Sequence, residues 1–264
     1  MKGYTELAVE RREILSDLSE ISEDTEQTGE ITVRRIGVLS DQAADRIGRP
    51  KGTYVTLELP ARLSKIETDP LAAVLTAEIR RLLPHTDGTV FAVGLGNPNV
   101  TVDALGALTA AHLLPTRHLI QRSLTSVAVI APGVPAASGL ETAERLAAIV
   151  KVLRPGAVLL IDALVSARPE RVGRMIQITD TGILPGSGTR GRPTAVNTAS
   201  LGVPTVALGV PMAASCDRDD AADFLLIPPD LDLLLEETAG LLGFAINCAL
   251  QPSLKPSDIR EMMP

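Results

Sequence analysis

The stretch TVFAVGLGNPNVTVDALGALTAAHLL, residues 89–114, decides the fold class of this chain. It consists of an apolar run, a turn with two glycines and then apolar residues at helical spacing, so it predicts strand, loop and helix. Asp103 stands in the N-cap position of the expected helix. Apolar runs and helical patterns continue to alternate downstream, and this alternation is typical of a parallel sheet covered by helices on both faces.

The rest of the chain completes an α/β fold class, with one mostly parallel sheet flanked by helices. Two β-branched runs near the N-terminus predict an antiparallel pair, and the acidic stretch before them predicts a solvated loop at 19–30. No repeat or linker interrupts the chain, so a single domain over 1–264 is expected. The predicted strands are 31–39, 53–60, 89–96, 126–133, 157–164 and 204–211, and the predicted helices are 69–84, 103–114, 139–153 and 229–250.

Composition excludes several classes of protein. Hydrophobic residues make up 45% of the 264 residues, which is enough for a sizeable core, but aromatic residues make up only 2%. The shortage of aromatic side chains and the net charge of −7 argue against direct nucleic-acid binding. The N-terminus lacks the apolar region of a signal peptide, and no run of about 20 apolar residues predicts a membrane span. We therefore expect a cytoplasmic protein that does not bind a membrane.

The glycine turn after the first of these strands is a weak match to a nucleotide-binding loop. Gly94 and Gly96 form a G-x-G pair, but Asn99 stands where a dinucleotide site has its third glycine. No Gly-Lys-Ser/Thr follows, so the Walker pattern is absent too. We expect no cofactor.

The tripeptide DAL occurs twice at the end of a predicted strand, with its aspartates at Asp103 and Asp162. Carboxyl ends of parallel strands meet at one edge of a sheet, so the two side chains are expected to converge. Each could instead be a structural cap. Two close carboxylates can share a proton and activate a water, or can bind a divalent metal together with histidine. The available histidines, His85, His112 and His118, lack a compact metal-binding spacing, so we expect no metal.

A third candidate aspartate, Asp180, begins the tripeptide DTG and precedes a glycine-rich segment. DTG also occurs in the β-rich aspartic proteases, but in this α/β pattern a local turn is the simpler interpretation. Arg190 on the glycine-rich segment could bind an acidic group of a peptide or lie in solvent.

Several long blocks in a fixed order resemble the germination protease of endospore-forming bacteria, an atypical aspartic peptidase. The blocks are GLGNPNVTVDALG, LLPTRHL, APGVPAASGLET, IDALVSARPERV, IQITDTGILPGSGTRG and LGVPTVALGVP. The resemblance implies an aspartic endopeptidase with a fold similar to that of hydrogenase maturation proteases and phosphorylases. It implies that Asp103 and Asp162 are catalytic, with Asp180, Gly96, Asn97 and Arg190 in supporting or substrate-binding roles.

The resemblance also implies an autoprocessing zymogen that acts in spore germination, in the spore core or forespore. Its substrates would be small acid-soluble spore proteins, and the stretch YTELAVE looks like their cleavage site. We therefore expect cleavage between Glu6 and Leu7, which makes residues 1–6 a propeptide, although an ordinary helix start at Thr5 would explain the same residues. The family is usually homo-oligomeric, but this chain has a short segment before its last helix. The alternatives are a metal-dependent peptidase related to hydrogenase maturation proteases and a non-enzymatic metabolite-binding module.

Overall fold

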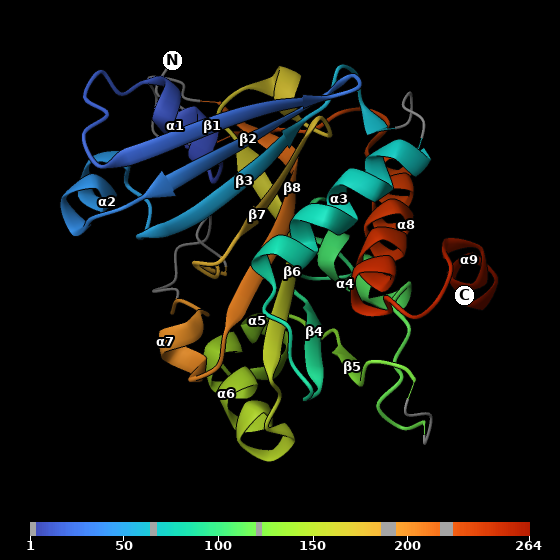
Figure 1. The fold of residues 1–264 in the computed structure, drawn as a ribbon. Helices are drawn as coiled ribbons and strands as arrows, with labels where there is room; N and C mark the ends of the chain where they lie inside the picture. The colour runs from blue at the N-terminus through green and yellow to red at the C-terminus, as the bar shows by residue number, and fades with distance from the viewer. Residues whose placement is uncertain (1–3, 64–67, 120–122, 186–193, 217–223) are drawn as a thin grey trace.

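The computed structural model describes residues 4–63, 68–119, 123–185, 194–216 and 224–264. Within these ranges the chain forms one nine-stranded mixed sheet with helices on both faces (Figure 1). The strand order is β1-β2-β3-β7-β8-β6-β4-β5, with β9 paired to β8. The strands are β1 Ile21–Thr28, β2 Ile31–Val38, β3 Gly52–Glu58, β4 Val90–Gly94, β5 Val127–Ile130, β6 Ala157–Ser166, β7 Met175–Thr179, β8 Thr205–Cys216 and β9 Phe224–Leu226.

The sheet has a parallel half and an antiparallel half. Strands β5, β4, β6 and β8 are mutually parallel. Strands β1, β2, β3 and β7 pair antiparallel, and β7 joins the two halves by pairing antiparallel with β8. The predicted α/β class, the parallel core and the antiparallel pair β2–β3 are confirmed, while the sheet as a whole is mixed.

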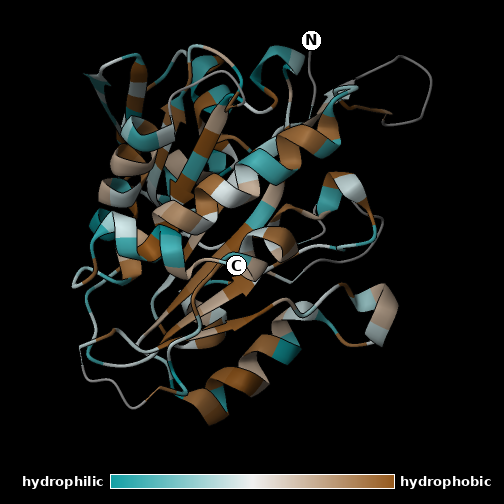
Figure 2. Cartoon of the chain, turned by 90° about the vertical axis from the view of Figure 1, so that its right-hand side faces the viewer, coloured by the Kyte–Doolittle hydropathy of each residue, from teal (hydrophilic) through white to brown (hydrophobic). Residues whose placement is uncertain are grey.

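Three hydrophobic clusters hold helices against the sheet, and Figure 2 shows the hydrophobic strands at its centre. One face is covered by α3 (Thr68–Leu82), α4 (Leu105–Ala111) and α8 (Leu231–Leu250). The other face carries two separate clusters. One packs α6 (Thr142–Leu153) and α7 (Thr198–Leu201) on the parallel strands, and the other packs α1 (Ala8–Glu13) and α2 (Asp41–Ile47) on the antiparallel strands. The short helices α5 (Pro135–Ser138), η2 (Thr101–Asp103), η3 (Pro169–Arg171) and α9 (Pro256–Met262) complete the described elements.

Two expectations about strands are wrong. The stretch expected to be a solvated loop contains β1, whose residues are almost all exposed. It lacks an apolar face, and it is held instead by pairing along β2 and by ion pairs of Arg34 with Glu23 and of Arg35 with Asp24 and Glu26. Strand β7 was not predicted, because its five residues merge with the turn that follows them.

The expectation that no segment is long and apolar enough to span a membrane is also wrong for α8. Its 20 residues are long and apolar enough to span a membrane by length and composition, but 78% of the apolar stretch is buried inside the protein. Helix α8 packs on α3 and α4, and it is a core helix of this fold.

Candidate functional site

Asp162 lies inside β6, in the gap between two hydrophobic clusters on one face of the sheet. Val158 and Leu160 belong to the cluster under α6, and Leu164 belongs to the cluster under α1 and α2. Alternate residues of a strand share a face, so Asp162 points between these two helix layers. Its side chain is 8% exposed, and its Oδ1 accepts the backbone N–H of Ala163 at 2.9 Å. We had placed Asp162 at the end of its strand, but β6 continues to Ser166 because its last residues pair with β8.

The loop after β4 approaches the same point. Leu95, just beyond β4, donates its N–H to the carbonyl of Ile161 at 2.8 Å, next to Asp162. Helix α4 lies close to both strands at Gly106, where a Cβ would collide with the carbonyls of Ile161 and Leu95. Gly94 faces Gly106 with equally little room. The two glycines therefore bring the loop of β4 beside β6.

Asp103 is held by this loop. Its Oδ2 accepts the backbone N–H of Asn97 at 2.8 Å, and it forms the last residue of η2. Gly96 has φ of +92°, and a Cβ there would collide with the carbonyl of Asp103. Gly96 and Asn97 thus fix the position of Asp103, because Gly96 allows its backbone to come close and Asn97 bonds its carboxylate. The N-cap position that we expected for Asp103 is wrong, because α4 begins at Leu105 and its N-cap is Ala104.

The two aspartates interact electrostatically. Burial raises the pKa of Asp162 well above its usual range, and the carboxylates of Glu6 and Asp103 raise it further. Burial also raises the pKa of Asp103, which the hydrogen bond from Asn97 partly offsets. Both shifts favour the protonated form, and the larger one is at Asp162, which is the more buried of the two.

The N-terminal segment lies over this site and contacts three strands. The N–H of Glu6 donates to the carbonyl of Val165 at 2.8 Å, and the Glu6 carboxylate accepts the N–H of Val165 at 2.8 Å. Ser215 on β8 donates its hydroxyl to the carbonyl of Tyr4 at 2.6 Å. Gln177 on β7 contacts the backbone on both sides of the Glu6–Leu7 bond. The peptide bond that we expect to be cut therefore lies against β6 and β7, and the Glu6 carboxylate is close enough to Asp162 to raise its pKa.

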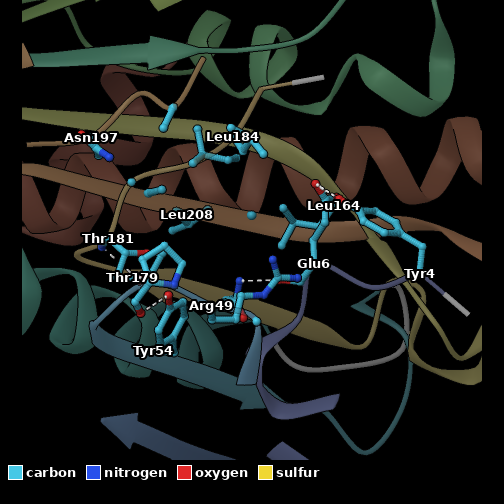
Figure 3. Close-up of a pocket in the computed structure, with 18 residues that line it drawn as sticks. Tyr4, Glu6, Arg49, Tyr54, Leu164, Thr179, Thr181, Leu184, Asn197 and Leu208 are labelled. Carbon is cyan, nitrogen blue, oxygen red and sulfur yellow. Dashed lines mark hydrogen bonds between the residues drawn. The ribbon is translucent and has the colours of Figure 1, made fainter. Parts of the chain in front are cut away.

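A cavity of about 250 Å³ adjoins Glu6, lined by residues from the strand ends and the N-terminal segment. Figure 3 shows Glu6 beside Arg49 at its centre, with Tyr54, Thr179 and Thr181 on one side. The Arg49 guanidinium donates to the carbonyl of Thr5, and burial lowers the pKa of Arg49. Burial raises the pKa of the Tyr54 phenol to about 12. The cavity can thus hold a small side chain or a peptide segment between a cation and hydroxyl groups.

The other predicted residues lie elsewhere. The Asp180 carboxylate accepts the N–H of Thr53 at 2.7 Å, so its contact holds the start of β3. Arg190 lies outside the described residues. His85 and His118 are exposed, and His112 packs against Gly243 of α8. Over the described part of the chain, no three His, Cys, Asp or Glu side chains are placed to hold a metal ion.

Sequence reasoning missed Gln177 and Arg49. Neither belongs to a motif, and a glutamine within a short strand or an arginine after a helix carries no signal of its own. Only the register of β7 against β8 and the path of the N-terminal segment give them their contacts. The site as a whole combines two carboxyl groups of raised pKa with a peptide segment held on the neighbouring strands, and such groups are suited to the activation of a water for hydrolysis.

Comparison with known proteins finds relatives over most of the chain. A model of the germination protease family matches residues 4–228. The chain is 32% identical to the germination protease of Clostridium tetani, with all of both chains covered. It is 32% identical to that of Clostridium perfringens, with 98% of each chain covered. Among solved structures, a NiFe hydrogenase maturation protease from Thermococcus kodakarensis has 18% identity and a TM-score of 0.43, over 66% of this chain and 99% of that chain.

Proposed function

The chain belongs to the germination protease family and is a protease, and we propose that it hydrolyses peptide bonds with Asp103 and Asp162 as its catalytic pair. The observation that carries this proposal is the raised pKa of both carboxyl groups, with the carboxylates of Glu6 and Asp103 among the causes at Asp162. One comes from the loop after β4 and the other from inside β6, and Asp103 is among the causes that raise the pKa of Asp162. Raised pKa values at a site that contacts a peptide are typical of acid and base catalysis.

The two groups have different surroundings, which supports different roles. Asp162 is the more buried and has the more strongly raised pKa, so it holds the shared proton. Asp103 is then the ionised base that takes a proton from water. The hydroxide formed adds to the peptide carbonyl, and Asp162 gives its proton to the leaving nitrogen as the C–N bond breaks. No acyl-enzyme forms in this sequence of steps.

We further propose that the chain is a zymogen that cuts itself between Glu6 and Leu7. The contacts of Glu6 with Val165 support this, because they hold the segment in an extended form along the end of β6. Leu7, Ala8 and Val9 are buried in the core, so residues 1–6 would leave while α1 stays. The intact segment also adds the Glu6 carboxylate, which raises the pKa of Asp162.

The expected substrates are proteins that carry a sequence like Thr5-Glu6-Leu7-Ala8, and we propose the small acid-soluble spore proteins. Arg49 beside Glu6 supports a preference for an acidic residue before the bond that is cut. The setting would be the cytoplasm of the forespore or the spore core, with the enzyme as a homo-oligomer.

The test is cleavage of the chain's own N-terminus and of a peptide containing TELA, followed by mass spectrometry. We expect Asp103→Asn and Asp162→Asn each to slow both reactions by about 10²- to 10⁴-fold, the usual contribution of a positioned acid or base. Asp87→Asn is the matched control, since Asp87 is exposed on a loop. Activity that survives both site substitutions would reduce Asp103 and Asp162 to structural residues.

A chelator in the same assay separates this proposal from a metal-dependent peptidase. Chelator-resistant cleavage supports the aspartate pair. Cleavage that stops with chelator and returns with added zinc would contradict it.

A further inference from the structure

The side chain of Gln177 spans the Glu6–Leu7 bond. Its Nε2 donates to the carbonyl oxygen of Glu6 at 3.2 Å, and its Oε1 accepts the N–H of Ala8 at 2.7 Å. The Ala8 N–H needs an acceptor, and this fixes the orientation of the amide with its N–H groups toward Glu6. Gln177 is 6% exposed, so these bonds form away from solvent.

The register of the sheet places Gln177 in one row with Asp162. Gln177 pairs with Gly209 of β8, and Gly209 pairs with Asp162 of β6. Adjacent strands are about 4.8 Å apart, so Gln177 and Asp162 stand about 10 Å apart on the same face. The residue between them is glycine, and a Cβ there would lie 2.6 Å from Leu164 Cγ. The Leu164 side chain therefore lies over this glycine, between the amide donor and the carboxyl group, and the N-terminal segment contacts the same strands.

During hydrolysis, negative charge develops on the carbonyl oxygen of the bond that is cut. When water adds to the carbon, the π pair of the C=O bond moves onto that oxygen. A donor that is already in place stabilises this charge without having to reorganise. Gln177 already donates a hydrogen bond to the Glu6 carbonyl oxygen.

We propose that Gln177 is a further catalytic residue, which donates a hydrogen bond to the carbonyl oxygen of the scissile bond and stabilises its oxyanion. Its other end holds the N–H of the second residue after the bond and so sets the register of the peptide. Gln177 transfers no proton, since water supplies the hydroxide and the aspartate pair moves the protons. The inference rests on the proposed function, because it takes Glu6–Leu7 as the bond that is cut.

Self-cleavage of the full chain tests it directly. The chain is purified in denaturant and refolded to start the reaction, and mass spectrometry follows the loss of residues 1–6. We expect Gln177→Ala and Gln177→Glu each to lower the first-order rate constant by about 10²- to 10³-fold, as for other oxyanion donors. The glutamate variant keeps the acceptor for Ala8 but has no N–H when it is ionised.

The matched control is Gln251→Glu. Gln251 is also buried, at 1% exposure, and its amide likewise bonds one backbone N–H and one carbonyl, both of Thr125. It lies at the end of α8, away from the site. We expect this variant to refold and to cleave itself at the wild-type rate. Circular dichroism of every variant checks that the chain is folded, so that the rate constants can be compared.

A second pair of variants tests the register contact without changing Gln177. Ala8→Pro removes the N–H that Gln177 accepts, and proline is tolerated because Ala8 is the first residue of α1. Ala8→Val adds similar bulk but keeps the N–H. We expect Ala8→Pro to cleave at least 10-fold more slowly than Ala8→Val, and the difference to vanish in the Gln177→Ala background.

If the Gln177→Ala chain cut itself as fast as the wild-type chain, this inference would be overturned. The proposed role of the aspartate pair would not be affected by that result. The inference would also be overturned if Ala8→Pro cleaved more slowly than Ala8→Val by the same factor in the wild-type and Gln177→Ala backgrounds. Failure of the proposed function has a different signature, because the wild-type chain itself would then not cut between Glu6 and Leu7.

Discussion

Asp162 is a carboxyl group within an apolar strand, and its surroundings set its protonation. The residues on either side of it along the same face, Leu160 and Leu164, are buried hydrophobic side chains. Its carboxyl group accepts a hydrogen bond from the neighbouring N–H of Ala163. Little at this site stabilises a negative charge on Asp162, whereas the nearby carboxylates of Glu6 and Asp103 disfavour it. The protein therefore holds a protonated carboxyl group at a pH where an exposed aspartate is ionised.

This raised pKa predicts how stability depends on pH. The folded chain binds a proton at Asp162 that the unfolded chain has lost, so wild-type stability falls as pH rises above about 3.9, the pKa of an unfolded aspartate. Asp162→Asn removes the group, and we expect it to raise the free energy of unfolding at pH 7 by about 1 kcal/mol or more. Urea unfolding of both proteins between pH 4 and pH 8 measures the difference.

The expected difference shrinks toward pH 4, where both states of the wild-type chain bind the proton. Asp87→Asn on an exposed loop again serves as the control. A variant that is less stable than wild type at pH 7 would show that Asp162 is ionised and satisfied in the fold.

At the scale of elements, α1 anchors the N-terminal segment from the core side. Glu10 is buried, and its carboxylate accepts the Ser166 hydroxyl at 2.6 Å and the N–H of Ala167 at 2.7 Å. Arg171 faces the same carboxylate at 3.5 Å. These bonds join α1 to the end of β6, four residues beyond Asp162. Cleavage at Glu6–Leu7 would leave this anchor in place.

Glu10→Gln should loosen the anchor. The amide keeps one acceptor oxygen, so either Ser166 or Ala167 loses its partner in a buried position. We expect the free energy of unfolding to fall by about 1–3 kcal/mol, the cost of a buried unsatisfied polar group. Urea unfolding checks this, with Glu30→Gln on an exposed turn as the control. Equal stability of the two variants would contradict the anchoring role.

The contact of α4 with β4 and β6 also belongs to the element scale. A Cβ on Gly106 would collide with backbone atoms of Ile161 and Leu95, which cannot move as a flexible side chain can. We expect Gly106→Ala to destabilise the protein by about 1–3 kcal/mol, as overpacking does, and to slow cleavage by moving the Asp103 loop. Gly240→Ala on α8 is the control and should be neutral or stabilising, because a Cβ there has open space. Thermal unfolding and the self-cleavage assay compare the two.

At the scale of the whole molecule, the site lies where the two halves of the sheet meet. Asp162 belongs to the parallel half, and Gln177 belongs to the strand that begins the antiparallel half. The helices on this face form an α6–α7 group and an α1–α2 group, and residues of both clusters, such as Ala207 and Leu164, line the cavity beside Glu6. Ligands of open α/β sheets bind in the crevice at the carboxyl ends of the strands.

Much of the fold was predictable because it depends on local patterns. The apolar runs of β4, β6 and β8 and the helical spacing of α3, α6 and α8 are features of contiguous residues. Strand β1 was not predictable, because it has no apolar face and depends on pairing with β2. The helical cap expected at Asp103 was wrong because the carboxylate is used by the Asn97 N–H instead.

The sequence by itself determined the α/β class, the family and the two aspartates, since each depends on residue types at short spacing. Tertiary structure alone decided that the carboxylates of Asp103 and Glu6 raise the pKa of Asp162, and that Gln177 spans the Glu6–Leu7 bond. These facts depend on strand register and on contacts between residues that are far apart in the sequence. Such contacts follow from the packing of the whole sheet and leave no periodic trace in the chain.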